Sequence, residues 1–148
     1  MGKLKRYERV YDQLQQLLLK SDDKEARMCT ITALLHHKMD HFFWTGFYCL
    51  QNEKLIVRTY QGSIACMELQ KDIGVCWASI NSNKTIVVQD VEQFSGHISC
   101  DSRSKSEIVV PLHDKIGKII GVLDVDSKEL NSFDQLDAFW LEKIVSLI

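Results

Sequence analysis

Proline and glycine are scarce in this sequence, which has one proline and seven glycines among its 148 residues. Stretches rich in these residues or in serine form the flexible linkers between domains. The sequence contains no such stretch, no internal repeat and no low-complexity segment. Its length suits one domain with a single hydrophobic core. We therefore expect one domain over residues 1–148.

A strong excess of charge of one sign is also missing, because the formal net charge is −2. Nucleic acids and anionic membranes attract basic proteins, so neither is an expected partner. No apolar run reaches the roughly 18 residues that a membrane span needs, and the N-terminal stretch lacks the apolar core of a secretory signal. Arg6 stands where a myristoylation signal on Gly2 would have serine or threonine. We expect a cytoplasmic protein.

Five cysteines are present, an odd number that cannot pair completely within one chain. In a reducing compartment, cysteines are more often catalytic, redox-active, metal-binding or buried than bridged for structure. Cys29 and Cys49 lie beside apolar residues and are predicted to be small core residues. Cys66, Cys76 and Cys100 lie in less apolar surroundings and are the candidates for chemistry.

Apolar residues at helical spacing predict three helices, with apolar stripes over residues 4–18, 28–35 and 136–147. Asp22 with Glu25, and Ser132 with Gln135, have the spacing of capping boxes and are expected to begin the second and third of them. A shorter helix is expected at GVCWASINS.

Runs of β-branched and aromatic residues predict two hairpins. The first joins HFFWTGFYCL to KLIVRTY, and the second joins EIVVPL to KIIGVLDVDS through a turn at residues 114–117. A further strand is expected at TIVVQD. Hairpins grouped between helices favour an α+β domain, with a central antiparallel sheet flanked by N- and C-terminal helices.

Two carboxylates are predicted to lie on one face of the last strand. Because side chains alternate along a strand, Asp124 and Asp126 should share a face with Ile120 and Val122. At a separation of about 7 Å, two buried carboxylates raise each other's proton affinity. A solvated strand end gives the same spacing and stays open as an alternative.

The stretch over residues 91–106 is predicted to bring a thiol to these acids. It has no apolar periodicity, and long ordered loops in compact domains are usually functional. Cys100 lies in this loop, and Glu107 follows it. Strands of similar length lead from the turn back to Glu107 and on to Asp124, so Glu107 should lie near the aspartate pair. Negative charge raises the pKa of a thiol, so these surroundings are unfavourable for a nucleophile. They make better sense if a carboxyl group is the proton donor and a positively charged substrate lies between it and Cys100.

A zinc site is the competing use of five residues, Cys66, Cys76, Cys100, His97 and His113. Zinc ligands usually come as close pairs, and only His97 and Cys100 form one. We therefore expect no metal. A protease-like triad is weaker still, because no serine motif is present.

Five segments resemble the free methionine-(R)-sulfoxide reductases, which are single GAF domains. They are, in order, WTGFY, QGSIAC, GVCWAS, VQDVEQFSGHISCDSRSKSEIVVPL and GKIIGVLDVDS. The resemblance implies a GAF-like fold and the reduction of free methionine (R)-sulfoxide to methionine. It also implies recycling by thioredoxin and no cofactor.

The resemblance also implies a catalytic role for each of five residues. Cys100 matches the nucleophile that attacks the sulfoxide sulfur. Cys66 matches the main resolving cysteine, and Cys76 matches a further cysteine that can form a disulfide. Glu107 and Asp126 match acids that hydrogen-bond the sulfoxide oxygen. These roles match what sulfoxide reduction requires, because a thiolate must attack the sulfur and an acid must protonate the departing oxygen.

Four more residues match the family's substrate-binding positions. Asp90 and Asp124 match acids that hold the ammonium group of the substrate, and Trp44 and Tyr48 match aromatic residues that cradle its methyl group. Trp77 departs from the pattern, because the family usually has a small residue after the cysteine that Cys76 matches. A large ring there would be expected to move Cys76 or to narrow the pocket.

A GAF module that binds a small molecule without turnover is the second hypothesis. Such a module would signal or pair through its terminal helices. The apolar stripes of these helices suit a homodimer, but they suit packing on the chain's own sheet equally well.

Overall fold

Six strands form one antiparallel sheet in the computed structural model, which describes residues 1–97 and 99–148. The order across the sheet is β3-β2-β1-β6-β5-β4. In chain order the strands are β1 Trp44–Gln51, β2 Lys54–Gln61, β3 Glu68–Leu69, β4 Ile86–Val88, β5 Ser106–His113 and β6 Ile119–Ser127. The two predicted hairpins are β1 with β2 and β5 with β6, and β1 pairs with β6 to join them.

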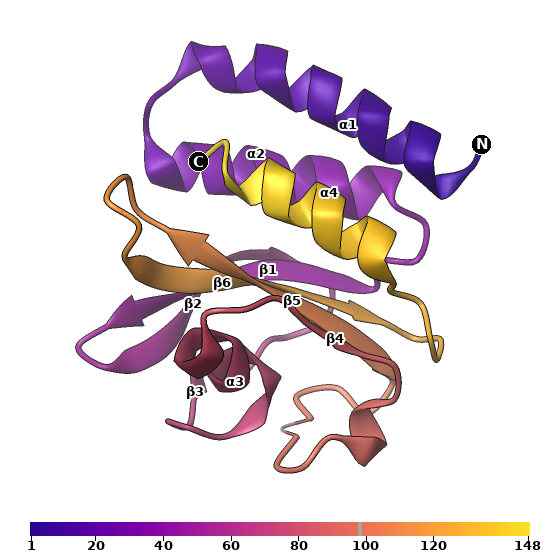
Figure 1. The fold of residues 1–148 in the computed structure, drawn as a ribbon, viewed down its shortest axis with the longest axis vertical. Helices are drawn as coiled ribbons and strands as arrows, with labels where there is room; N and C mark the ends of the chain where they lie inside the picture. Colours follow the sequence, from indigo (N-terminus) through magenta and orange to yellow (C-terminus); the bar gives the residue numbers. More distant parts are fainter. Residues whose placement is uncertain (98) are drawn as a thin grey trace.

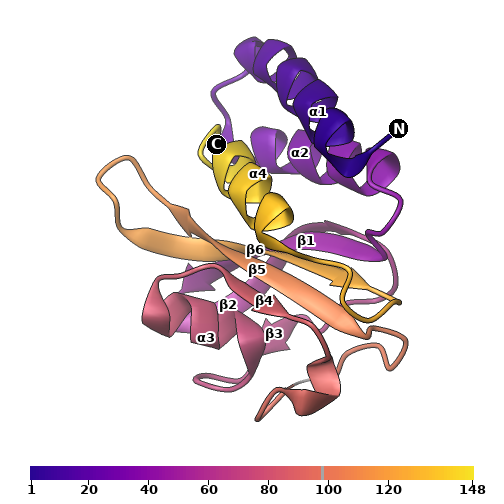
Figure 2. The same cartoon turned by 45° about the vertical axis from the view of Figure 1, so that its right-hand side comes forward.

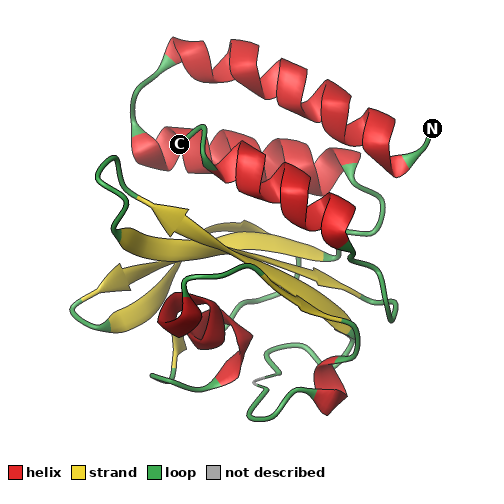
Figure 3. Cartoon of the chain, viewed as in Figure 1, coloured by secondary structure: helices red, strands yellow, loops and turns green. Residues whose placement is uncertain are grey.

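Helices cover both faces of this sheet (Figure 1). They are α1 Lys3–Leu17, α2 Lys24–Lys38, α3 Gly74–Ser82 and α4 Gln135–Val145, with short 3-10 turns at Leu18–Lys20 and Val91–Gln93. The first, second and fourth lie on one face, and α3 lies on the other (Figure 2). The predicted α+β architecture is confirmed, with helices from both ends of the chain on the same side (Figure 3). No described helix is long and apolar enough to cross a membrane.

Each face of the sheet has its own apolar cluster. The helix-side core packs residues of α1, α2 and α4 against Phe47, Ile108 and Leu123, which are fully buried. The site-side cluster packs α3 against the opposite face and includes Trp44 and Val122. Successive residues of β6 alternate between the two clusters, as strand geometry requires. Side chains on the second face are therefore free to form a site under α3.

The register at the β5–β6 turn corrects one prediction. The turn at residues 114–117 is present, and the Asp114 carboxylate accepts hydrogen bonds from the N–H groups of Ile116 and Lys118. Pairing shifts between Leu112 and His113, which leaves Ile120 without a partner in the ladder. Ile120 therefore packs against the helix-side core. It does not share a face with Val122, because the extra residue resets the alternation.

Both predicted capping boxes lie at the wrong residues. The carboxylate of Asp23, the residue after the predicted Asp22, caps α2. Asp134 caps α4 and forms a capping box with Asp137, two residues beyond the predicted pair that began at Ser132. Several neighbouring residues have side chains able to cap, and the sequence pattern alone does not choose between them.

The two cysteines assigned to the core behave differently. Cys49 is half-buried and packs against the helix-side core. Cys29 is exposed on α2, so that prediction was wrong. It directly follows the buried Met28, and one residue of α-helix turns the side chain by about 100°. Cys29 therefore points away from the core that Met28 faces.

One buried carboxylate ties the N-terminal helix to α4. Asp137 accepts hydrogen bonds from the Tyr7 hydroxyl at 2.6 Å and from Lys3 Nζ at 2.7 Å. His41 Nε2 lies 3.0 Å from it. Burial alone would raise the pKa of Asp137, but the hydrogen bonds from His41, Lys3 and Tyr7 outweigh it and hold the pKa well below its usual range. Asp137 therefore stabilises the fold above the ordinary aspartate pKa, and this stabilisation is lost as the pH falls.

Replacing Asp137 by asparagine is expected to lower the free energy of unfolding by about 3 kcal/mol, because buried partners lose their charged acceptor. Urea unfolding at neutral pH measures the change. Asp12→Asn, at an exposed position on α1, is the matched control and should change stability by less than about 0.5 kcal/mol. Equal stability of the two variants would contradict the role given to the Asp137 network.

Candidate active site

Strand alternation and register bring three acids together under α3. Asp124 and Asp126 lie on the site-side face of β6, and Glu107 of β5 pairs directly with Asp126. The prediction that Glu107 lies near the aspartate pair is therefore confirmed. On the other side of β6, Trp44 pairs with Asp126 and Gly46 pairs with Asp124. The acids thus lie near the centre of the sheet, two on β6 and one on the neighbouring β5.

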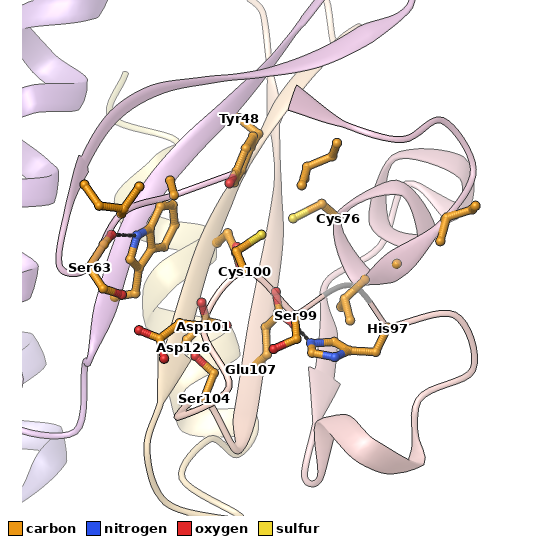
Figure 4. Close-up of a pocket in the computed structure, with 18 residues that line it drawn as sticks. Tyr48, Ser63, Cys76, His97, Ser99, Cys100, Asp101, Ser104, Glu107 and Asp126 are labelled. Carbon is orange, nitrogen blue, oxygen red and sulfur yellow. Dashed lines mark hydrogen bonds and ion pairs between the residues drawn. The ribbon is translucent and has the colours of Figure 1, made fainter. Parts of the chain in front are cut away.

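A cavity opens above these acids (Figure 4). Its volume is about 50 Å³. It is lined by Trp44, Tyr48, Ser63, Ile64, Ala65, Leu69, Ile73, Gly74, Val75, Cys76, His97, Ser99, Cys100, Asp101, Ser104, Glu107, Asp124 and Asp126. Seven of the nine predicted site residues are among them. The two others are Cys66, which is bonded to a lining residue, and Asp90.

Asp90 is not brought to the cavity. Its carboxylate accepts a hydrogen bond from the N–H group of Glu92 at 3.0 Å, at the start of the 3-10 turn Val91–Gln93. Aspartate before a helical turn commonly makes this local bond. The role in ammonium binding that the resemblance implies for Asp90 stays a prediction.

Two of the three candidate cysteines line the cavity, and the third is bonded to one of them. Cys66 and Cys100 form a disulfide across 34 residues of sequence, with their Cα atoms 5.6 Å apart. Cys100 lies in an exposed loop, whereas Cys66 is half-buried. Cys76 is a free thiol near the start of α3 and is buried. Its sulfur lies within 4.8 Å of carboxylate oxygens of Glu107 and Asp124.

Burial changes the protonation of all three acids. Desolvation, followed by the charge of Asp126, raises the pKa of Glu107 to about 8. Burial and the neighbouring Glu107 raise the pKa of Asp124 well above its usual value. Burial and then Asp124 do the same for Asp126. At neutral pH the Glu107 carboxyl therefore holds a proton that it can donate.

Burial also affects Cys76. Desolvation, and then the negative charges of Asp124 and Glu107, raise the pKa of its thiol. A thiol in such surroundings is a poor nucleophile at neutral pH. Cys100 lies in the exposed loop and differs from Cys76 in this respect. Of these two cysteines, Cys100 is therefore the more accessible from solvent.

His97 lines the cavity, and the sequence reasoning named it only as a possible metal ligand. Its Nε2 atom lies 3.6 Å from Glu107 Oε1, and its side chain is 15% exposed against 7% for Glu107. Burial lowers the pKa of His97, so the ring is mostly neutral at neutral pH. The only sign in the sequence that His97 belongs to the site is its position three residues before Cys100.

The loop that carries Cys100 is held by a second missed contact. Arg103 donates to the Asp101 carboxylate at 2.7 and 3.0 Å, and its guanidinium lies 5.0 Å from the centre of the Phe43 ring. These contacts hold the loop against the chain just before β1. No periodic pattern in the loop pointed to them.

Two aromatic rings of β1, Trp44 and Tyr48, form one wall of the cavity. The Trp44 ring stacks between Tyr48 and Tyr60, with ring centres 5.9 and 5.4 Å away. Its indole N–H donates to the Ser63 carbonyl at 3.0 Å. A side chain at Gly46 would collide with the Trp44 ring and with Tyr60, so only glycine leaves room for this stack.

The Tyr48 hydroxyl has a specific partner. It donates a hydrogen bond to the backbone carbonyl of Cys66 at 2.9 Å. The resemblance implies that Tyr48 contacts a methyl group. The structure adds that Tyr48 holds the segment that carries Cys66 next to β1. The hydroxyl thus positions the backbone of Cys66, while the ring is the part that is predicted to contact the methyl group.

Trp77 neither lines the cavity nor displaces Cys76. It is buried in the site-side cluster, and its indole N–H donates to the Leu69 carbonyl at 3.2 Å. Consecutive helix residues point about 100° apart. Trp77 therefore packs beside β3 while Cys76 faces the acids, and the expected narrowing of the pocket does not occur.

The GAF domain family matches residues 9–148 of the chain. GAF domain-containing protein A of Dictyostelium discoideum is 46% identical, over 99% of this chain and 92% of its own length. The free methionine-R-sulfoxide reductase of Saccharomyces cerevisiae is 37% identical, over 91% of this chain and 83% of its own length.

A solved structure agrees over nearly the whole chain. It is the X-ray structure of free methionine-R-sulfoxide reductase from Neisseria meningitidis in complex with its substrate. That chain is 35% identical, with a TM-score of 0.94 over 99% of this chain and 88% of its own length. The present chain therefore belongs to the GAF domain family and is closely related to the free methionine-R-sulfoxide reductases.

Proposed function

We propose that this protein reduces free methionine (R)-sulfoxide to methionine and is recycled by thioredoxin. The observation that carries the proposal is the placement of Cys100 and Glu107 on one cavity. A sulfur nucleophile and a carboxyl group that keeps its proton at neutral pH are the two groups that sulfoxide reduction needs.

The first half-reaction uses Cys100 and Glu107. The Cys100 thiolate attacks the sulfoxide sulfur while Glu107 gives its proton to the sulfoxide oxygen. The attack joins the two sulfurs. The hydroxyl group then transfers to the Cys100 sulfur as the sulfur–oxygen bond and the new sulfur–sulfur bond break, so methionine leaves and Cys100 becomes a sulfenic acid. Asp126, which pairs with Glu107 across the strands, lies where it can share the hydrogen bonding of that oxygen.

The second half-reaction uses Cys66. Its thiolate attacks the Cys100 sulfur, the hydroxyl group leaves as water with one more proton, and the Cys66–Cys100 disulfide forms. The two electrons that reduce the sulfoxide thus come from the two thiols. The dithiol of thioredoxin then reduces the disulfide by exchange. The disulfide between Cys66 and Cys100 supports this order of events.

The acids also suit the choice of a free amino acid. Asp124 is 7% exposed, and its Oδ1 has no hydrogen-bond partner among the described residues. A buried acceptor without a partner favours a ligand that brings a charged donor, such as an ammonium group. A methionine sulfoxide within a peptide has no such group at its backbone nitrogen.

An epimer-resolved assay with thioredoxin, thioredoxin reductase and NADPH tests the proposal. Free methionine (R)-sulfoxide should drive NADPH oxidation and yield methionine, and the S epimer should not. Acetylation of the substrate nitrogen should lower kcat/KM by about 100-fold, because a charged hydrogen bond is lost in a buried site. Consumption of the S epimer, or no turnover of any sulfoxide, would refute the proposal. The second outcome would favour a GAF module that only binds.

A further inference from the structure

We propose that the protein binds one zinc ion through Cys76, Glu107 and Asp124, and that the ion displaces to solvent the protons that Cys76 and Glu107 hold at neutral pH. These three side chains are buried, and one ligand atom from each lies within 4.8 Å of the other two. They come from α3, β5 and β6, so the fold brings together ligands that are far apart in the sequence. This separation explains why ligand spacing along the chain did not indicate the site.

A second observation points to a cation at this place. Asp124 Oδ1 is buried and has no hydrogen-bond partner among the described residues. No lysine or arginine is among the described residues that line the cavity. A buried acceptor left without a donor carries a desolvation cost, which a bound cation would offset.

The ligand chemistry favours zinc over the common hard cations. Thiolate is a soft ligand that suits zinc, whereas magnesium and calcium prefer oxygen ligands alone. Three protein ligands and an open position are the usual set of an accessible zinc site. The cavity of about 50 Å³ has room for a water molecule at the fourth position. His97 lies 3.6 Å from Glu107 and is the nearest additional nitrogen donor.

The ion would use the same carboxylates as the substrate of the proposed reaction. Zinc and free methionine (R)-sulfoxide should therefore exclude each other from the cavity, a consequence that rests on the proposed function. The binding of zinc itself does not, because it requires only the three ligands.

Cobalt and zinc binding to the protein with its Cys66–Cys100 disulfide intact tests the site. Cobalt should bind in a 1:1 ratio and give a thiolate-to-cobalt charge-transfer band that zinc abolishes. Cys76→Ser should lose the band and weaken zinc binding by at least about 10-fold. Asp124→Asn should keep the band but weaken zinc binding by a similar factor. Cys29→Ser is the matched control, since this exposed thiol lies on α2, and it should change nothing.

Three results would overturn the site. They are no zinc uptake by the unaltered protein, a folded Cys76→Ser variant that binds zinc as tightly as the unaltered protein, and an Asp124→Asn variant with unchanged affinity. If Cys76→Ser does not fold, the zinc affinity of Asp124→Asn still decides whether the site exists.

A competition experiment separates this inference from the proposed function. In Cys100→Ser, which cannot turn over, free methionine (R)-sulfoxide should weaken the apparent affinity for zinc. The S epimer chelates zinc equally well in solution and is the matched control. Tight zinc binding that neither epimer affects would refute the shared use of the carboxylates and leave the metal site standing. Absence of zinc binding would refute the site, whatever the sulfoxides do.

Discussion

Replacing Cys100 by serine is expected to abolish methionine formation. A serine hydroxyl is hardly ionised at neutral pH and cannot form the sulfenic acid through which oxygen leaves the substrate. The buried Cys76 cannot take over, because burial and the adjacent carboxylates keep its thiol protonated. Loss of a nucleophile without a substitute is expected to lower single-turnover methionine formation by more than about 10³-fold.

The control for this loss is Cys29→Ser, at an exposed thiol of α2. This helix lies on the face of the sheet opposite α3 (Figure 1). The control variant should keep full activity. Cys66→Ser should form one methionine per chain and then lose efficient recycling, because thioredoxin finds no Cys66–Cys100 disulfide to reduce. Undiminished activity of Cys100→Ser would contradict the assignment of the nucleophile, and full multiple turnover by Cys66→Ser would contradict the assignment of the resolving cysteine.

Glu107→Gln is expected to lower the rate of the first half-reaction by about 10²–10⁴-fold, the usual contribution of a general acid. Glutamine has nearly the same shape as glutamate, but it has no acidic proton to give to the sulfoxide oxygen. Single-turnover methionine formation measures the step without the contribution of thioredoxin. Glu129→Gln, at an exposed position just after β6, should have no effect.

The same residue predicts a pH dependence. The pKa of Glu107 is raised to about 8, so its carboxyl is protonated below this value and ionised above it. Because the acid acts in its protonated form, the single-turnover rate should fall about 10-fold per pH unit above pH 8. Glu107→Gln should lack this decline. A native rate that stays level well above pH 8 would show that another group protonates the oxygen.

The acids could be placed from the sequence because only local rules were needed. Alternation puts Asp124 and Asp126 on one face, and a hairpin with a recognisable turn puts Glu107 opposite Asp126. The same reasoning failed for Ile120, because one unpaired residue in the ladder resets the alternation. Such an irregularity leaves no mark in a pattern of apolar residues.

Contacts made by long loops could not be predicted from the sequence. The distance between His97 and Glu107 depends on how the loop folds back over β5, and no periodicity encodes that path. The pairing of Cys66 with Cys100 came from family resemblance and not from spacing. Trp77 was expected to narrow the pocket, but its ring points away from the cavity towards Leu69. Which way a helical side chain points depends on where the helix begins, and the identity of one residue does not reveal this.

The Cys66–Cys100 bridge has a consequence for the order of the catalytic cycle. In the oxidised chain, the bridge ties the Cys100 loop across a cavity of about 50 Å³, far below the roughly 300 Å³ of typical small-molecule pockets. A second substrate can bind only after the bridge has opened. The two half-reactions must therefore alternate strictly, so the proposed enzyme would follow ping-pong kinetics, with the oxidised protein unable to form a dead-end complex with its own substrate.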